Sequence, residues 1–154
     1  MSFLQTLRVS ASGLSAQRLR MDVIANNLAN ANSTRTQDGG PYKRQQIVFT
    51  PMFEQEKLRH NRFAGDRASY LPFNTRLNAG GVKVAGIVTD DREGKMVLDP
   101  HHPDANVDGY VEHPNVNTIA EMTDLISATR SYEANVTAIK TLKAMALKAL
   151  ELGR

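Results

Sequence analysis

The feature that most constrains this chain is a pair of long terminal segments almost free of helix-breaking residues. The first 30 residues contain no proline and one glycine, Gly13, and neither residue type occurs between Pro114 and Gly153. Because proline and glycine destabilise helix interiors, both ends are predicted to form long helices. A C-terminal helix of about 34 residues would be roughly 50 Å long at 1.5 Å per residue.

Both segments carry apolar residues at alternating steps of three and four, which is the spacing of one narrow helical seam. We therefore expect the two helices to pair along these seams. The seam of the first segment is Leu4, Leu7, Ala11, Leu14, Arg18, Met21, Ala25 and Leu28, and that of the second is Met122, Leu125, Thr129, Tyr132, Val136, Ile139, Lys143, Ala146 and Leu150.

Polar residues mark where each helix should stop or start. Asn26, Asn27, Asn30 and Asn32 fall within seven residues, so the first helix should end near residues 28–31. The asparagines are compatible with an ordinary fraying helix end, or with hydrogen bonds between subunits that fix their register. Thr118 followed by Glu121 matches a capping box, which predicts the start of the second helix.

The middle of the chain has the alternation of β-strands. Residues 42–53 and 81–98 are predicted strands, with Val82, Val84 and Val88 on one face and a hairpin loop over 90–94 leading into 95–98. Residues 54–79 are predicted to be a long loop, and residues 99–115 an extended, turn-rich segment. The predicted class is α+β, with a terminal helical assembly domain (1–31 and 115–154) and a β-rich middle domain (32–114).

Several apolar residues lie off both seams, and a lone helical pair would leave them in water. They are Val9, Ala16, Val23, Ile24, Ile119, Leu142, Met145 and Ala149. Burying one such side chain contributes about 1.5–3 kcal/mol, so the pattern favours assembly with partner subunits. The alternative is a compact α+β domain in which the helices pack on the β-rich middle.

The sequence shows no pattern typical of an enzyme or of a metal or cofactor site. There is no cysteine and no G-x-S-x-G motif, and His101 and His102 are adjacent, so their side chains diverge. Residues 104–109 resemble the opening of a calcium loop, but Asn115 stands where the bidentate Glu is needed, and a turn explains the same residues. We predict no catalytic site, no metal and no cofactor.

Charge leaves two further functions open. The net charge is +3, and the stretch 35–76 holds eight basic against four acidic residues. This stretch is either a solvated basic surface or a contact for peptidoglycan or an acidic neighbouring subunit. A small basic nucleic-acid-binding domain is the main alternative function, and an enzyme acting on the cell wall comes third. No secretory or membrane-spanning apolar run is present.

Residues 12–32, SGLSAQRLRMDVIANNLANAN, resemble the N-terminal signature of the flagellar rod and hook protein family, and residues 25–30 are its most diagnostic part. Residues 99–105, 108–111 and 114–117 resemble the signature of the proximal-rod members. The similarity spans nearly the whole chain. Two departures are mild: Ser33 stands where the family often has Thr, and His101 where it often has Gly.

This resemblance implies a structural subunit of the proximal rod of the flagellar basal body. Such a subunit polymerises with itself and other rod proteins into a driveshaft that transmits torque across the periplasm and encloses the export channel. The family pairs its terminal helices as a coiled coil and leaves the cell through the flagellar type III export apparatus without a cleaved signal peptide. It implies neither membrane insertion nor nucleic-acid binding.

The candidate assembly interface combines the two predicted seams with the asparagine cluster. It comprises Leu4, Leu7, Leu14, Met21, Asn26, Asn27, Leu28, Asn30, Met122, Leu125, Tyr132, Val136 and Ile139.

Overall fold

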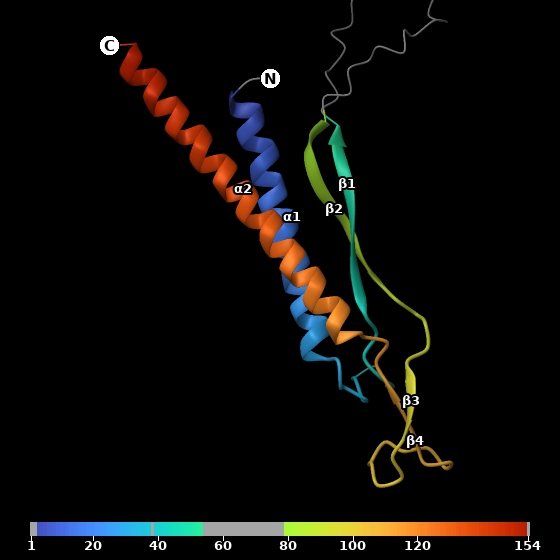
Figure 1. Cartoon of the computed structure of the whole chain (residues 1–154). Helices are drawn as coiled ribbons and strands as arrows, with labels where there is room; N and C mark the ends of the chain where they lie inside the picture. The colour runs from blue at the N-terminus through green and yellow to red at the C-terminus, as the bar shows by residue number, and fades with distance from the viewer. Residues whose placement is uncertain (1–2, 38, 54–78, 154) are drawn as a thin grey trace, which may run out of the picture.

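Two long helices and two antiparallel strand pairs make up the described part of the chain, which in this computed structural model is residues 3–37, 39–53 and 79–153 (Figure 1). This confirms the predicted α+β class. The elements in chain order are α1 (Phe3–Ala29), β1 (Gln45–Phe53), β2 (Ala79–Thr89), β3 (Lys95–Leu98), β4 (Tyr110–His113) and α2 (Thr118–Leu152).

The two helices pack side by side and run in opposite directions, so the predicted pairing is confirmed (Figure 1). Gly13 permits a close approach, since a Cβ there would lie 3.0 Å from Nδ2 of Asn135 on α2. Met21 and Thr129 meet across the pair, with the hydroxyl 3.5 Å from the sulfur. The C-terminal turns of α2 extend past the start of α1 (Figure 1).

The β1–β2 hairpin packs on α1, which therefore contacts both α2 and the hairpin. The backbone N–H of Val82 donates to the Ser12 hydroxyl at 3.1 Å. The register shifts between Val48 and Phe49, so that Ala85 is an extra residue in β2. This bulge reverses the alternation beyond it. The prediction that Val88 shares a face with Val84 is therefore wrong, and Val88 is 54% exposed.

The predicted hairpin between residues 81–89 and 95–98 is also wrong. β2 is already paired with β1, and β3 pairs instead with β4, with Lys95 opposite His113 and Leu98 opposite Tyr110. The backbones of the two segments approach closely here, since a Cβ at Gly94 would clash with the carbonyl oxygen of His113. The turn-rich segment 99–115 thus contains a strand, β4, that is only four residues long.

The C-terminal end of α1 and the N-terminal end of α2 lie where they were predicted, but the residue that caps α2 differs from the prediction. α1 ends at Ala29, and α2 begins at Thr118. The N-cap is Asn117, whose side-chain oxygen accepts from the N–H groups of Ile119 (3.1 Å) and Ala120 (3.3 Å). Glu121 points into the fold and closes no capping box, because its carboxylate is used elsewhere.

The buried apolar core of the described residues is small. It consists of Ala16, Val23, Ile24, Ala31, Val111 and Ala128. The expectation that Ala16, Val23 and Ile24 lie outside the protein core is wrong, because α1 is covered by the hairpin as well as by α2. The compact alternative is thus correct for α1.

The off-seam residues of α2 behave differently, because Ile119 and Met145 remain exposed. The predicted loop over 54–79 falls outside the described residues except for Ala79, which begins β2. Among the described helices, none combines the length and apolar character needed to cross a membrane.

Candidate assembly interface

A hydrogen-bonded cluster joins the C-terminal end of α1 to β1 and to the start of α2. We call Asn27, Tyr42, Arg44 and Glu121 the junction cluster. Asn27 is 1% exposed, and its amide donates to the carbonyl oxygen of Gln45 (2.8 Å) and to the Glu121 carboxylate (3.0 Å). Its oxygen accepts from the backbone N–H of Gln45 (2.9 Å) and from the Tyr42 hydroxyl (3.0 Å). The side chain therefore uses both of its donors and both acceptor positions within one subunit.

Glu121 is the most buried charge of this cluster, at 1% exposure. The Arg44 guanidinium offsets this charge, since its Nε donates to Oε1 of Glu121 at 2.6 Å and its Nη2 lies 2.6 Å from the same oxygen. A buried ion pair is costly to break, about 3–5 kcal/mol when one partner is removed. Glu121 thus ties the start of α2 to Arg44, which immediately precedes β1.

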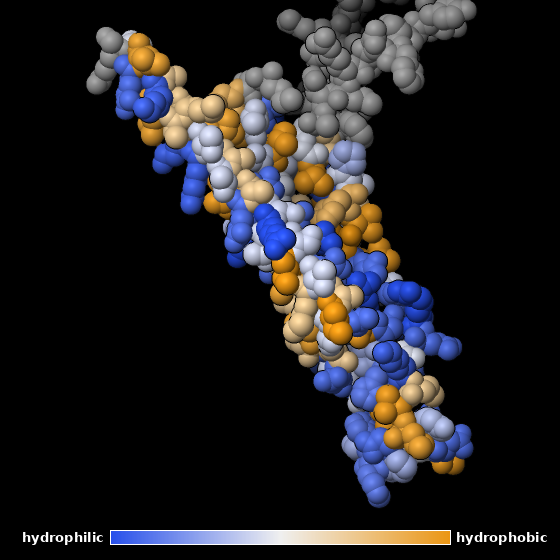
Figure 2. Space-filling view, in the orientation of Figure 1, coloured by the Kyte–Doolittle hydropathy of each residue, from blue (hydrophilic) through white to orange (hydrophobic). Residues whose placement is uncertain are grey.

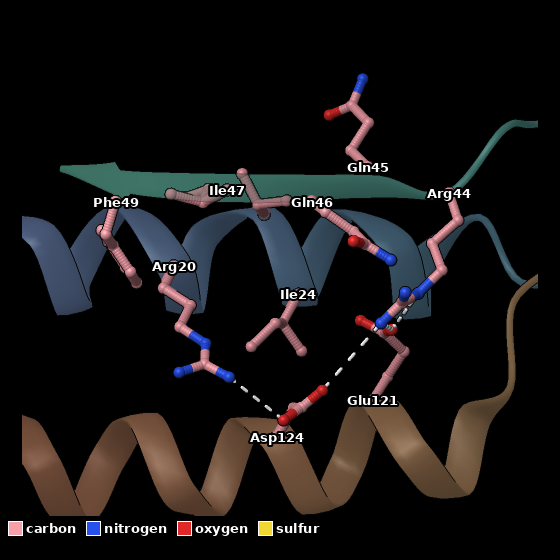
Figure 3. A pocket seen from close by; sticks show the side chains of 10 residues that line it. Arg20, Ile24, Arg44, Gln45, Gln46, Ile47, Phe49, Glu121 and Asp124 are labelled. Atoms are coloured by element: carbon pink, nitrogen blue, oxygen red, sulfur yellow. Dashed lines mark hydrogen bonds and ion pairs between the residues drawn. The ribbon is translucent and has the colours of Figure 1, made fainter. Parts of the chain in front are cut away.

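A second ion pair lies beside the first in an open groove between α1, β1 and α2 (Figure 3). Arg20 on α1 donates to Asp124 on α2 at 3.1 Å, and Arg44 approaches the other oxygen of Asp124 at 4.0 Å. Gln46 and Phe49 of β1 line the same groove. Both carboxylates in the groove are paired with arginine, so the arrangement serves as a joint between elements. No cluster of three metal-ligating side chains occurs within the part of the chain that is described.

The surroundings of Tyr42 favour the neutral, protonated form of its hydroxyl group. Burial, and then the negative charge of Glu121, raise the pKa of its hydroxyl above the ordinary value of 10.0. The hydroxyl therefore keeps its proton at neutral pH and donates it to Asn27. This raised pKa follows first from the burial of the phenol and second from the negative charge of Glu121 beside it.

Exposed apolar side chains lie on the face of α2 opposite the junction cluster and at both ends of the molecule (Figure 2). Ile119, Met122 and Ile126 are 76%, 53% and 56% exposed and recur at helical spacing along one stripe of α2. Buried Glu121 and Ala128 lie on the other side of this helix. Figure 2 shows apolar surface along the lower half of α2, at its C-terminal tip and over β3 and β4. At the end of the helix pair where α1 starts and α2 ends, the exposed large apolar residues are Phe3, Leu4, Met145, Leu147, Leu150 and Leu152.

The thirteen predicted interface residues fall into three groups. Leu4, Asn26 and Met122 are exposed, and Asn27 is buried in the junction cluster. The remaining nine are half-buried, so part of each stays exposed to solvent: Leu7, Leu14, Met21, Leu28, Asn30, Leu125, Tyr132, Val136 and Ile139. Their role in assembly stays a prediction.

Sequence reasoning missed the junction cluster. Asn27 was grouped with its neighbours, although Asn26 is exposed and Asn30 donates to the Asn26 carbonyl oxygen within its own helix end (3.0 Å). One available signal was Glu121, which is four residues before Leu125 and seven before Ala128. A carboxylate on that inward stripe requires a buried partner, and this requirement points to a cation elsewhere in the chain.

Comparisons with known proteins agree with the architecture. The family model described as flagellar basal body rod FlgEFG protein C-terminal matches residues 107–152, and the flagella basal body rod protein model matches residues 7–35. The chain is 44% identical over 160 residues to the flagellar basal-body rod protein FlgC of Bacillus subtilis, covering 100% of both. It is 43% identical to FlgC of Borreliella burgdorferi, covering 99% of this chain and 98% of that protein. It is 37% identical to FlgC of Salmonella typhimurium, with 100% of both covered.

Proposed function

This chain belongs to the flagellar basal-body rod protein family, and from that premise we propose how it serves as a structural subunit of the rod. The α1–α2 pair, fixed to β1 by the junction cluster, is a preassembled block. Its exposed apolar surfaces bind neighbouring subunits. The alternative of a nucleic-acid-binding domain finds no support among the relatives.

The observation that carries this proposal is the apolar stripe Ile119, Met122 and Ile126. A monomeric protein rarely leaves such a stripe uncovered, since burying each side chain contributes about 1.5–3 kcal/mol. The stripe lies on a regular helix whose other face is already packed on α1. A further helix could cover it without disturbing the fold of the subunit.

The finer assignment is to the proximal rod. We propose that the chain polymerises with itself and with other rod proteins around the export channel and transmits torque across the periplasm. It would reach that place through the flagellar type III export apparatus. The predicted interface residues Leu4, Leu7, Leu14, Met21, Leu28, Leu125, Tyr132, Val136 and Ile139 support this through their exposed parts, and Met122 through its exposure.

The asparagine cluster and the basic stretch 35–76 have less structural support as contact sites than the apolar positions. Asn26 and Asn30 at the end of α1 are the better candidates for hydrogen bonds between subunits, because the amide of Asn27 is fully engaged inside its own chain.

In the basic stretch 35–76, Lys43 pairs with Asp91 (2.8 Å) and Arg44 pairs with Glu121. A contact with peptidoglycan rests mainly on residues outside the described part. We propose no enzymatic activity.

The test is Met122→Asp in cells that depend on this chain for motility. A carboxylate at an exposed position leaves the isolated subunit folded, but burying it against a partner is costly. We expect an unchanged circular dichroism spectrum and unfolding midpoint, and a loss of swimming and of basal bodies. Ser127→Asp is the matched control, because Ser127 is exposed on another side of the same helix, away from the stripe. Normal basal bodies with Met122→Asp would refute the stripe as an interface.

A further inference from the structure

The β3–β4 ribbon protrudes from one end of the molecule and carries more apolar surface than so small a unit can cover. Every residue of β3 is exposed, including Met96, Val97 and Leu98 at 57%, 43% and 62%. Val107 in the connecting loop is fully exposed, and Tyr110 is 42% exposed. A two-stranded ribbon is at best marginally stable alone in water. Val111 is buried and Asp104 bonds to Thr34, but the apolar side chains above have no cover within the described part of the chain, which favours a partner surface.

The ribbon is also acidic. Residues 96–112, which we call the ribbon tip, hold Asp99, Asp104, Asp108 and Glu112 and no lysine or arginine, so the formal charge is −4. Asp104 is partly offset, since its carboxylate accepts from the Thr34 hydroxyl at 2.8 Å and lies 3.8 Å from Arg35. Asp108, next to Val107, is exposed to solvent.

The opposite end of the molecule has the complementary character. Residues 139–152 of α2, which we call the basic end, hold Lys140, Lys143 and Lys148 against Glu151, a formal charge of +2. All four side chains are exposed. Met145, Leu147 and Leu150 lie between them and Leu152 follows Glu151, and these four apolar side chains are 52–88% exposed. Figure 2 shows apolar surface at both ends of the elongated molecule.

A contact between the two ends joins one copy to the next in a head-to-tail manner. The ribbon tip and the basic end lie at opposite ends of the molecule (Figure 1), so they cannot contact each other within one subunit. In such a heterologous contact each added copy uses one of its two surfaces and leaves the other free for the next copy. Repeated addition then gives a ring where the rotation closes and a helical array where it does not.

We propose that the ribbon tip docks on the basic end of a second copy of this chain. Apolar side chains of the tip cover those at the end of α2, and the tip carboxylates lie near the lysines. This rests on the proposed rod function and names the partner surface of the ribbon. Opposite charges fix the orientation, because tip-to-tip contacts would place like charges together.

The experiment uses the absence of cysteine from the chain. Val107→Cys is combined in turn with Leu147→Cys, Leu150→Cys or Leu152→Cys in full-length protein, and basal bodies purified from cells are oxidised. At least one pair should give a ladder of covalent multimers containing only this chain. The control pair combines Val107→Cys with Thr137→Cys, which lies about 20 Å before Leu150 along α2 and should give no ladder.

Charge exchange tests the orientation. Asp108→Lys or Lys148→Glu alone should reduce the ladder several-fold, and the two together should restore much of it. Basal bodies that contain the double-cysteine chains but yield no ladder with any of the three pairs would overturn the docking proposal and leave the rod function intact. Absence of the wild-type chain from purified basal bodies would instead overturn the rod function. A cross-link from Val107→Cys variants to a different rod protein engineered with cysteine would likewise overturn the choice of a second copy.

Discussion

At the scale of single residues, the side chain of Asn27 on α1 bonds to β1, to α2 and to Tyr42. Replacing it with Ala removes its four hydrogen bonds and leaves the backbone of Gln45 and the carboxylate of Glu121 without those partners. Each buried group left unsatisfied costs about 1–3 kcal/mol, whereas Ala gains only a few tenths of a kcal/mol in helix propensity (about 0.5).

We therefore expect Asn27→Ala to lower the free energy of unfolding by at least about 2 kcal/mol, measured by denaturant titration of the isolated subunit. Asn26→Ala is the matched control, because Asn26 is the preceding residue of the same helix and is exposed. It should be neutral or slightly stabilising. Equal stabilities of the two variants would show that the junction cluster does not hold the subunit together.

Tyr42 provides a pH-dependent test of the same cluster. Its pKa is raised in the folded chain, so the folded state holds the phenol proton more tightly than the unfolded state does. The stabilisation is fully present below pH 10 and is lost as the pH rises through the folded pKa. Wild type should thus lose stability between neutral pH and about pH 11 more steeply than Tyr42→Phe. Parallel pH profiles would contradict this role of Tyr42.

At this scale the sequence predicted a helix end but not the buried residue within it. The density of asparagine between residues 26 and 32 indicates where helix propensity fails. Which asparagine is buried depends on Tyr42, Gln45 and Glu121, and Glu121 lies 94 positions away in the chain. Local pattern carries no information about a contact at that separation.

At the scale of elements, β2 lies directly on α1 because Gly81 has no side chain. Its φ of +124° is one that other residues rarely adopt, and a Cβ there would clash with the Ser12 hydroxyl. Backbone strain alone costs about 1–3 kcal/mol, and the steric clash adds to it, so Gly81→Ala should lower the free energy of unfolding by at least this amount. Denaturant titration of the isolated subunit measures this.

Gly86 in the same strand is the control for this substitution. A Cβ at Gly86 has no atom within 4 Å outside its immediate neighbours, and its φ is not positive. Gly86→Ala should be neutral or mildly stabilising. If both alanine variants lose the same stability, the effect belongs to the strand in general and not to its contact with α1.

Helices and strands were predictable where a sequence pattern extends over many residues, and were not predictable where the structure depends on which strands pair. Both helices extend over 27 or more residues and were predicted within a few residues of their limits. The bulge at Ala85 and the partner of β3 depend on which strand is free to pair, and β4 has four residues, too few to show alternation. The stripe at Ile119, Met122 and Ile126 follows from helical spacing, but only the fold shows that none of the described residues covers it.

At the scale of the whole molecule, stability is concentrated near one end of the helix pair. The buried residues Val23, Ile24, Asn27, Glu121 and Ala128 lie at the end of α1 and the start of α2. Beyond Ala128, α2 contains no fully buried residue, and its last turns hold four exposed large apolar side chains. Local stability follows buried contacts, so the two ends of α2 should open with different free energies.

The last prediction is that assembly, and not folding, orders the C-terminal third of α2. In dilute solution, amide hydrogen exchange should be slowest around residues 21–28, 44–48 and 118–129 and should become progressively faster toward residues 140–152. In purified basal bodies the fast-exchanging turns should become protected, because a partner then covers Met145, Leu147, Leu150 and Leu152, which the isolated subunit leaves exposed. Asn27→Ala separates the two effects: it should speed exchange at the junction of the free subunit and leave the already fast turns of 140–152 unchanged. Full protection of α2 to its end in the dilute monomer would contradict the prediction, since exposed apolar side chains with few contacts cannot hold those turns closed.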